Sequence, residues 1–420
     1  EETLYLFQTV KFKQALIIME KLDDMKLTVL YIEYRNFFID VLSRFYGFEK
    51  YDIYHYSEIL NVDELCRNEA LNWDMYLIEF WGKEKINWEY LSGNKCLSWT
   101  ADLFDKYYDY WEWDILSSNE GIFWNELLLN KYKSKLNWNL LSLNKSLPWS
   151  IDFINRYVDR LNWVNLSANL SLPWSDYLLE YYENLWDWNL ISANPSLPWT
   201  DDLIIKYMDR LNWAGLSMNP ALPWSSEFIQ KYKYNWIWGY SSDWVMTDDI
   251  GLCGNSGIHW NEELIEMFDG FIDWGELSLN TGDMWNECLI DKYLCKLHWE
   301  ECWCPPLGMG GLSSNPSLPW SLDFVDKYKP YLNIKEICSN MSFPWREEDF
   351  RNNNGGIIND CDKSYWKLLS MNEGLPWSVG VLYDNRCWFD WNLMKGNVKV
   401  YDNCLSVLEK EKMKFLLELV

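Results

Sequence analysis

The chain has 420 residues, of which 49% are hydrophobic and 18% aromatic, and its formal net charge is -26. This composition excludes a disordered chain, because there is ample apolar surface to bury. The acidity argues against nucleic acid and anionic membranes as partners, since binding to either depends on Lys and Arg. A basic protein partner is compatible with it.

Two further features of the sequence bear on membrane insertion and cellular location. No apolar run approaches the ~18–20 residues that a membrane span requires, so we expect no span. The 11 cysteines are odd in number and irregular in spacing, which is not typical of a disulfide framework. We therefore expect an intracellular, cytoplasmic location.

Residues 1–64 contain no recognisable repeat. Apolar, aromatic and charged residues alternate there at roughly helical spacing. We predict an N-terminal helical cap, because a solenoid needs a cover over its open end.

From residue 65 onward one phrase recurs, for example LSANLSLPWS at residues 166–175 and LSMNPALPWS at 216–225. A fixed period in the range of ~20–50 residues indicates a solenoid. We predict an all-α fold, an α-solenoid of about twelve 25-residue helix-turn-short-helix units over residues 65–392. The Trp that ends the phrase, called the anchor Trp below, stands at Trp73, Trp99, Trp124, Trp149, Trp174, Trp199, Trp224, Trp260, Trp285, Trp320, Trp345 and Trp377.

Each position of the phrase has a local physical meaning. The residue after the anchor Trp is usually Ser, Thr, Asn or Asp, which predicts the N-cap of a helix of about three turns. The anchor Trp would then pack on the fourth helical residue as a hydrophobic staple. A second Trp, fourteen residues after most anchors, begins a shorter helix. An Asn five residues before the next anchor would end it, in a left-handed C-cap and with its amide bonded to nearby backbone. These structural roles are predicted for Asn144, Trp149, Asn169, Trp174, Asn194, Trp199, Asn219 and Trp224.

Three insertions interrupt the period, near residues 239–251, 300–311 and 351–360. Insertions in repeat proteins map to loops, which often lie on a binding face. After the last unit, residues 393–420 are predicted to form a C-terminal cap helix. The Ser of the phrase is replaced three times by cysteine, at Cys66, Cys253 and Cys338. We interpret these as small buried residues.

One group of residues does not follow the repeat. Cys295, His298, Cys302 and Cys304 offer thiolate and imidazole ligands of the kind that bind zinc. The Cys-x-Cys spacing is not that of a common zinc finger, and Cys295 can equally be a core residue. The sequence contains no nucleophile elbow or Walker loop. We therefore expect no enzyme and no cofactor, and zinc bound by these four residues is kept as an alternative.

The function expected from the residues is that of a scaffold for protein–protein interaction. Acidic residues such as Asp152, Asp202 and Asp323 recur in the predicted first helical turn, where they suit the helix dipole. They would line one face and bind a partner, basic or part of a larger assembly. An alternative is a glycan-binding protein that uses exposed Trp244 and Trp303 on the insertion loops. A second alternative is a zinc-stabilised or enzymatic repeat protein.

The phrase LSxNPxLPWS also resembles a known kind of repeat. Together with Ile205-Lys206-Tyr207 and Gln230-Lys231-Tyr232, it is similar to Trp-rich short helical repeats in uncharacterised proteins of large DNA viruses, phages and some bacteria. The resemblance covers roughly residues 65–392 and the three insertions depart from it. It implies a viral or phage origin and a structural role, including that of a virion component, and it brings no activity.

Overall fold

The computed structural model describes residues 22–239, 251–299, 311–350, 363–406, 408 and 410–419. In these residues all regular structure is helical and no strand occurs, so the predicted all-α solenoid is confirmed. None of the helices in the same ranges is long and apolar enough to cross a membrane. The chain divides into two compact units, one of residues 1–98 with 344–420 and one of residues 99–343, called unit 1 and unit 2 below.

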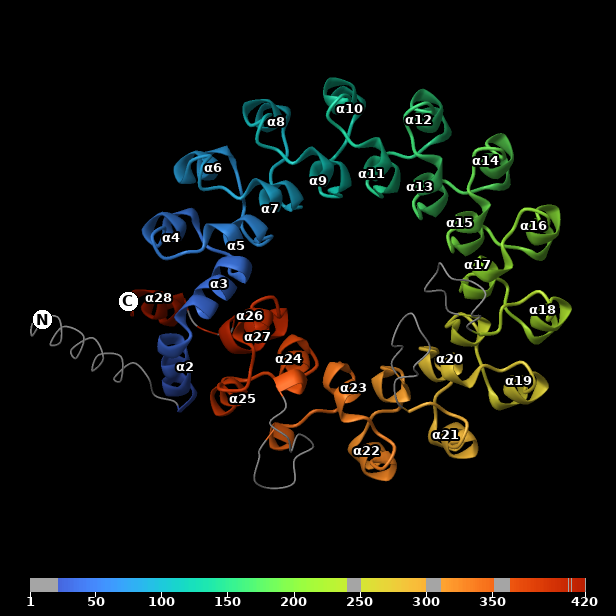
Figure 1. The fold of residues 1–420 in the computed structure, drawn as a ribbon. Helices are drawn as coiled ribbons and strands as arrows, with labels where there is room; N and C mark the ends of the chain where they lie inside the picture. Colours follow the sequence, from blue (N-terminus) through green and yellow to red (C-terminus); the bar gives the residue numbers. More distant parts are fainter. Residues whose placement is uncertain are drawn as a thin grey trace, which may run out of the picture. The chain divides into compact units, whose positions relative to one another are not determined.

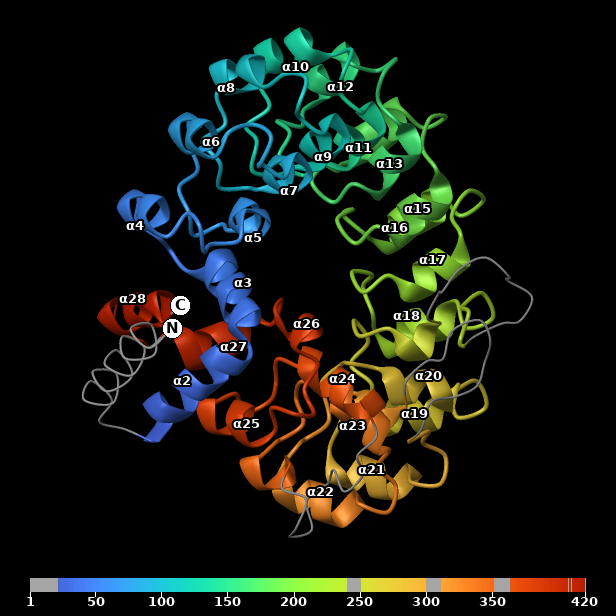
Figure 2. The same ribbon diagram turned by 60° about the vertical axis from the view of Figure 1, so that its left-hand side comes forward.

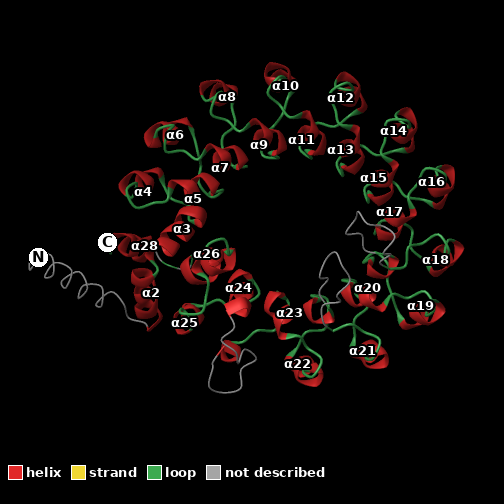
Figure 3. Cartoon of the chain, in the orientation of Figure 1, coloured by secondary structure: helices red, strands yellow, loops and turns green. Residues whose placement is uncertain are grey.

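In unit 2 the helices alternate between two rows that curve together (Figure 1). Each repeat contributes one helix to each row, and the helices that begin with the second Trp lie on the inner side of the curve (Figure 3). The outer row consists of α8 (Ala101–Lys106), α10 (Glu126–Tyr132), α12 (Ile151–Arg156), α14 (Asp176–Tyr181), α16 (Asp201–Lys206), α18 (Ser226–Lys231), α19 (Glu262–Met267), α21 (Glu287–Tyr293) and α22 (Leu322–Tyr328). The inner row consists of α9 (Trp113–Ser118), α11 (Trp138–Leu143), α13 (Trp163–Ala168), α15 (Trp188–Ala193), α17 (Trp213–Met218), η1 (Leu252–Gly254), α20 (Trp274–Leu279), η2 (Leu312–Ser314) and α23 (Ile334–Ser339).

The outer helices begin as predicted but are shorter. In α12 the Ser150 hydroxyl accepts a hydrogen bond from the Phe153 N–H at 3.1 Å, which is N-cap geometry. The helix has six residues and ends before Tyr157, so the prediction of about three turns was wrong. Residues 157–162 form the connecting turn instead, because Trp163 begins the inner helix of the same unit.

The anchor Trp packs at the start of each outer helix. Trp99 stacks on Phe104, the fourth helical residue, with ring centroids 5.3 Å apart, as a staple should. In other units the partner is the third helical residue, as with Trp149 on Phe153 at 5.3 Å. The indole N–H of Trp149 also donates to the Asn144 carbonyl at 3.0 Å, which fixes the turn between the two rows.

The Ser of the phrase connects one unit to the next. Ser142 Oγ donates to the Trp138 carbonyl at 2.7 Å and accepts from the Asn162 N–H of the following unit at 2.9 Å. Where Cys253 replaces Ser, its Sγ accepts from the Asp273 N–H at 3.3 Å. Cys66, Cys253 and Cys338 are all fully buried, which confirms the prediction that they are small buried residues.

The Asn of the phrase also acts between units, and the predicted left-handed C-cap was wrong. Asn169 follows helix α13 with φ -73° and ψ 121°, which is extended backbone, and no described residue other than Gly has a positive φ. The extended ending turns the amide toward the preceding unit, where Nδ2 donates to the Ser142 carbonyl at 2.8 Å. Its Oδ1 accepts from the Ser171 N–H at 2.8 Å. The residue is 2% exposed, so these bonds lie inside the stack.

Unit 1 contains both ends of the described chain (Figure 2). Although residues 22–67 lack the Trp phrase, α3 makes the contacts of an inner helix. Ser43 Oγ accepts from the Asn61 N–H at 3.0 Å, and the Ser43 carbonyl accepts from Asn68 Nδ2 at 2.8 Å. At the N-terminal end of α3, the Tyr34 ring stacks on the Trp391 ring, with the two ring centroids 4.0 Å apart. The helices of unit 1 are α2 (Leu22–Glu33), α3 (Arg35–Phe45), α4 (Lys50–His55), α5 (Val62–Arg67), α6 (Met75–Trp81), α7 (Trp88–Gly93), η3 (Glu347–Phe350), α24 (Lys363–Met371), α25 (Val379–Asp384), α26 (Trp391–Met394), α27 (Val398–Val400), the π-helical η4 (Tyr401–Leu405) and α28 (Lys410–Glu418).

Candidate functional site

The acidic residues predicted to form an interaction surface lie on the outer row of unit 2. Asp152, Asp202 and Asp323 are exposed in the first turns of α12, α16 and α22. Each stands three residues after its anchor Trp, and no ion pair of these three is found within the described residues. The same position carries an exposed acid in Asp102, Glu227 and Glu263.

A second set of outer-row acids is engaged by the next unit. Lys231, seven residues after its anchor Trp, reaches back to Asp201 at 2.5 Å, and the Tyr232 hydroxyl donates to the same carboxylate at 2.8 Å. Hydrogen bonds from the Lys231 ammonium and then the Tyr232 hydroxyl lower the pKa of Asp201. These acids stand two or six residues after the anchor Trp. The corresponding bridges join Lys131 to Asp105, Arg156 to Glu126, Lys206 to Glu180, Lys292 to Glu262 and Glu266, and Lys327 to Glu287 and Asp291.

The interface between α18 and α19 departs from this pattern. Met267 stands where a bridging Lys would stand, and Phe268 replaces the Tyr that would donate a hydroxyl. On the facing helix, Ser226 and Gln230 occupy the two positions that carry acids elsewhere. Both the cation and its acceptors are therefore missing from this contact between outer helices.

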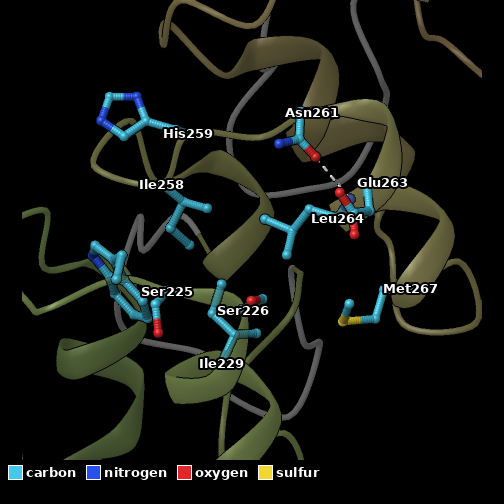
Figure 4. A pocket seen from close by; sticks show the side chains of 10 residues that line it. Ser225, Ser226, Ile229, Ile258, His259, Asn261, Glu263, Leu264 and Met267 are labelled. Carbon is cyan, nitrogen blue, oxygen red and sulfur yellow. Dashed lines mark hydrogen bonds between the residues drawn. The ribbon is translucent and has the colours of Figure 1, made fainter.

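A pocket of about 260 Å³ lies at this interface (Figure 4). Ile229, Leu264 and Met267 supply its apolar wall, and Met267 is 50% exposed. Its polar lining includes Glu263, which the described residues do not pair with a cation. The Asn261 amide oxygen is occupied by the Leu264 N–H at 2.8 Å, so Glu263 supplies the charge of the pocket. The pocket is lined by Trp224, Ser225, Ser226, Ile229, Ile258, His259, Asn261, Glu263, Leu264 and Met267.

The predicted zinc ligands are only partly described. Cys295 is exposed after α21, and the His298 N–H donates to Ser278 Oγ at 2.9 Å, which is the bond that joins successive units elsewhere. Cys302 and Cys304 lie outside the described residues. Within those residues, no group of three or more His, Cys, Asp or Glu side chains could hold a metal ion. Trp244 and Trp303, named for glycan binding, also lie outside them.

Two buried glutamates were missed by the sequence analysis. Glu276 and Glu336 are 3% and 7% exposed. Glu276 Oε2 accepts from the Gly251 N–H at 2.5 Å, and Glu336 Oε2 accepts from the Gly311 N–H at 2.8 Å. Each glycine ends an insertion, and each glutamate belongs to the following unit. The available signal was an acid on the inner helix after each of these two insertions.

The close approach at the first insertion requires glycine. A Cβ at Gly251 would lie 2.8 Å from Glu276 Oε2 and 2.7 Å from the Gly239 nitrogen. Gly239 and Gly251 therefore bring the two ends of this insertion together, with the Glu276 carboxylate beside them. The first insertion therefore begins and ends at the same place on the inner row.

Glu276 should make the stability of unit 2 depend on pH. Burial, and then the nearby Asp273, raise the pKa of Glu276 to about 8. The folded state holds this proton more tightly than the unfolded state, so the contribution is fully present below pH ~4.5 and is lost as pH rises toward 8. We expect the free energy of unfolding to fall by roughly 1 kcal/mol per pH unit in that window, relative to Glu276→Gln.

Urea denaturation of both proteins at pH 5, 6, 7 and 8 measures this difference. Glu276→Gln keeps the shape and an oxygen acceptor but cannot ionise, so it removes only the titration. A stability difference between the two proteins that stays constant over these pH values would contradict the assignment.

Comparisons of the chain with protein-family models, with curated protein sequences and with solved structures find no match.

Proposed function

We propose that this protein is a non-enzymatic repeat scaffold that binds a basic protein partner along the outer row of its helices. The observation that carries the proposal is that the recurring residues fall into two groups, one buried in the framework and one exposed on the outer row. The Trp, Ser and Asn of each unit are used in packing and in bonds between units. Acids three residues after the anchor Trp occur in six of the nine outer helices of unit 2, and all six are exposed.

Charge supports a basic partner. The chain carries a formal charge of -26, and such a field raises the rate at which a basic protein associates. Acids three residues after the anchor Trp place carboxylates at repeated positions along one row. A partner with several Lys or Arg side chains could engage them together, and simultaneous contacts add to affinity.

We further propose that the scaffold works inside a cell, or in the particle of a virus or phage, as part of a larger assembly. Cys66, Cys253 and Cys404 are buried free thiols, which suits a reducing compartment. A viral setting rests on the resemblance of the repeat phrase alone.

Charge reversal on the outer row tests the proposed function. The variant replaces by Lys the three predicted acids Asp152, Asp202 and Asp323. The control replaces by Lys three exposed acids of unit 2 that lie in the turns after outer helices, Asp109, Asp159 and Asp209. Both variants change the net charge by the same amount, so they differ only in which part of the surface is altered.

The measurement is the retention of proteins from an extract of the source cells by each immobilised protein, followed by mass spectrometry. We expect the wild type and the turn variant to retain the same basic partner and the outer-row variant to lose most of it. Equal retention by all three proteins would contradict the proposal. If both variants lose the partner equally, retention depends on net charge alone, and the proposal that the outer row binds the partner fails.

A further inference from the structure

The pocket between α18 and α19 can be understood from the neighbouring contacts of the outer row. In α16 and α18 the stem of Lys231 crosses from one helix to the other, and its ammonium meets Asp201. The same ammonium lies 4.9 Å from the centre of the Tyr232 ring. Lys206 and Lys327 repeat this arrangement, at 5.0 Å and 4.9 Å from the following Tyr. A basic side chain thus fills the gap between outer helices in these units.

Another interface without a bridging Lys keeps the hydrogen bond of the tyrosine hydroxyl. Between α12 and α14, Tyr181 takes the Lys position, and the Tyr182 hydroxyl donates to Asn155 Oδ1 at 2.7 Å. At α18 and α19 the pair is Met267 and Phe268, so neither an ammonium nor a hydroxyl crosses the contact. The pocket of about 260 Å³ lies at this contact, with Met267 in its lining.

We propose that the α18–α19 pocket binds the side chain of an Arg or Lys residue from a protein partner. The proposal rests on the proposed function, because it assumes a basic protein as the partner. It goes beyond it by naming one pocket and the kind of side chain that enters it.

The lining suits a basic side chain in two ways. The apolar wall of Ile229, Leu264 and Met267 can cover the hydrocarbon stem, as such walls do for long basic side chains. The cationic head would then meet the Glu263 carboxylate, and the half-buried Trp224 also lines the pocket, within which a cation–π contact can add to the binding. His259 is already beside Asp283, at 3.2 Å, and is not needed for the contact.

A small peptide tests the pocket without the unidentified partner. The probe is acetyl-Gly-Arg-Gly-amide, and its neutral control is the same peptide with citrulline in place of arginine. Citrulline has nearly the same shape but no charge, so it separates charge recognition from filling of space. The readout is the NMR signal of the Met267 methyl group in protein labelled with ¹³C-methyl methionine, assigned with a Met267→Leu variant.

We expect a saturable shift of the Met267 signal with the Arg peptide, with a Kd of about 1 mM as for a ligand of this size, and little shift with the citrulline peptide. Glu263→Gln should weaken binding of the Arg peptide at least fivefold. The matched control is Asp202→Asn, at the equivalent position of α16, where Lys206 already bridges to Glu180 of α14. It should leave the affinity unchanged.

A second variant closes the pocket from within. Met267→Lys combined with Gln230→Glu recreates the bridge found between the neighbouring helices, so the fold should be kept while the peptide is excluded. Saturation-transfer NMR on the peptide follows binding to this variant, and circular dichroism confirms its fold. Loss of binding with retained helicity supports the proposal. Undiminished binding would overturn it, as would an absent shift at Met267 or equal binding of the citrulline peptide.

The outcomes keep the pocket separate from the acidic outer row. The peptide titration does not involve Asp152 or Asp323, so its failure would leave the proposed function standing if the outer-row reversal still abolishes retention of the partner. If reversal has no effect while the peptide binds at Met267, the pocket stands and the outer-row proposal fails.

Discussion

Replacing Asn194 by Leu is expected to cost about 3–5 kcal/mol of unfolding free energy. Asn194 is 3% exposed, and its Nδ2 donates to the Ser167 carbonyl at 2.9 Å and the Asn169 carbonyl at 3.3 Å. Its Oδ1 accepts from the Ser196 N–H at 2.9 Å. Leu fills a similar volume but leaves two carbonyls and one N–H inside the stack without this partner.

The matched control is Asn189→Leu in the same unit. Asn189 is exposed on α15, and its Oδ1 accepts a surface hydrogen bond from Asn212 at 2.8 Å. Exposed groups can bond to water instead, so this change should cost less than about 1 kcal/mol. Urea denaturation followed by circular dichroism compares the two variants. If Asn194→Leu proves as stable as Asn189→Leu, the hydrogen bonds between units do not hold the stack.

The same variant should also reduce cooperativity. Stability in a repeat array is the sum of the stabilities of the units and of the contacts between neighbours. Asn194 acts on a contact between two units, so its loss should broaden or split the unfolding transition. A transition that moves to lower urea with an unchanged slope would indicate that the damage is confined to one unit.

The second large effect is expected for Trp124→Ala, which should cost about 3–5 kcal/mol. Trp124 is fully buried, and its ring lies 5.8 Å from that of Phe104 on the preceding outer helix. Truncation to Ala would leave a cavity between two units. Thermal and urea denaturation measure the loss, and a cost below about 1 kcal/mol would show that this anchor is not part of the core.

Substitution by Phe separates packing from hydrogen bonding at the anchor positions. The Trp124 indole N–H has no hydrogen-bond partner among the described residues, whereas the Trp199 N–H donates to the Asn194 carbonyl at 2.9 Å. Both residues are buried. Trp199→Phe should therefore cost about 1 kcal/mol more than Trp124→Phe. Equal costs would mean that the indole hydrogen bond contributes nothing to stability.

The sequence predicted the parts of the fold that depend on neighbouring residues. The 25-residue period, the N-caps such as Ser150 and the burial of Cys253 all follow from short patterns. The left-handed C-cap predicted for the Asn was wrong because the partners of its Nδ2 lie about 25 residues earlier in the chain, on another unit. A pattern within one unit cannot distinguish an amide that caps its own helix from one that bonds to the preceding helix.

Other features of the structure depend on contacts that no single unit contains. Ser43 takes the role of the repeat Ser within a segment that lacks the Trp phrase, so the sequence offered nothing to align. In the sequence, Glu276 is indistinguishable from an ordinary surface acid. Only the structure shows its contact with Gly251. The α18–α19 pocket had a signal, since Met267 interrupts a series of Lys and Arg, but only the structure shows what those basic residues fill.

We propose that recognition takes place on the outer row while the repeated phrase builds the framework. Photo-crosslinking from one position on each row tests it most directly, with a photoreactive residue placed at Tyr177 on α14 or at Val164 on α13. The two side chains are 58% and 50% exposed, so they differ in location and hardly in accessibility. We predict that the partner crosslinks to position 177 and not to position 164. Crosslinks from position 164 with none from position 177 would place recognition on the inner row and contradict the claim.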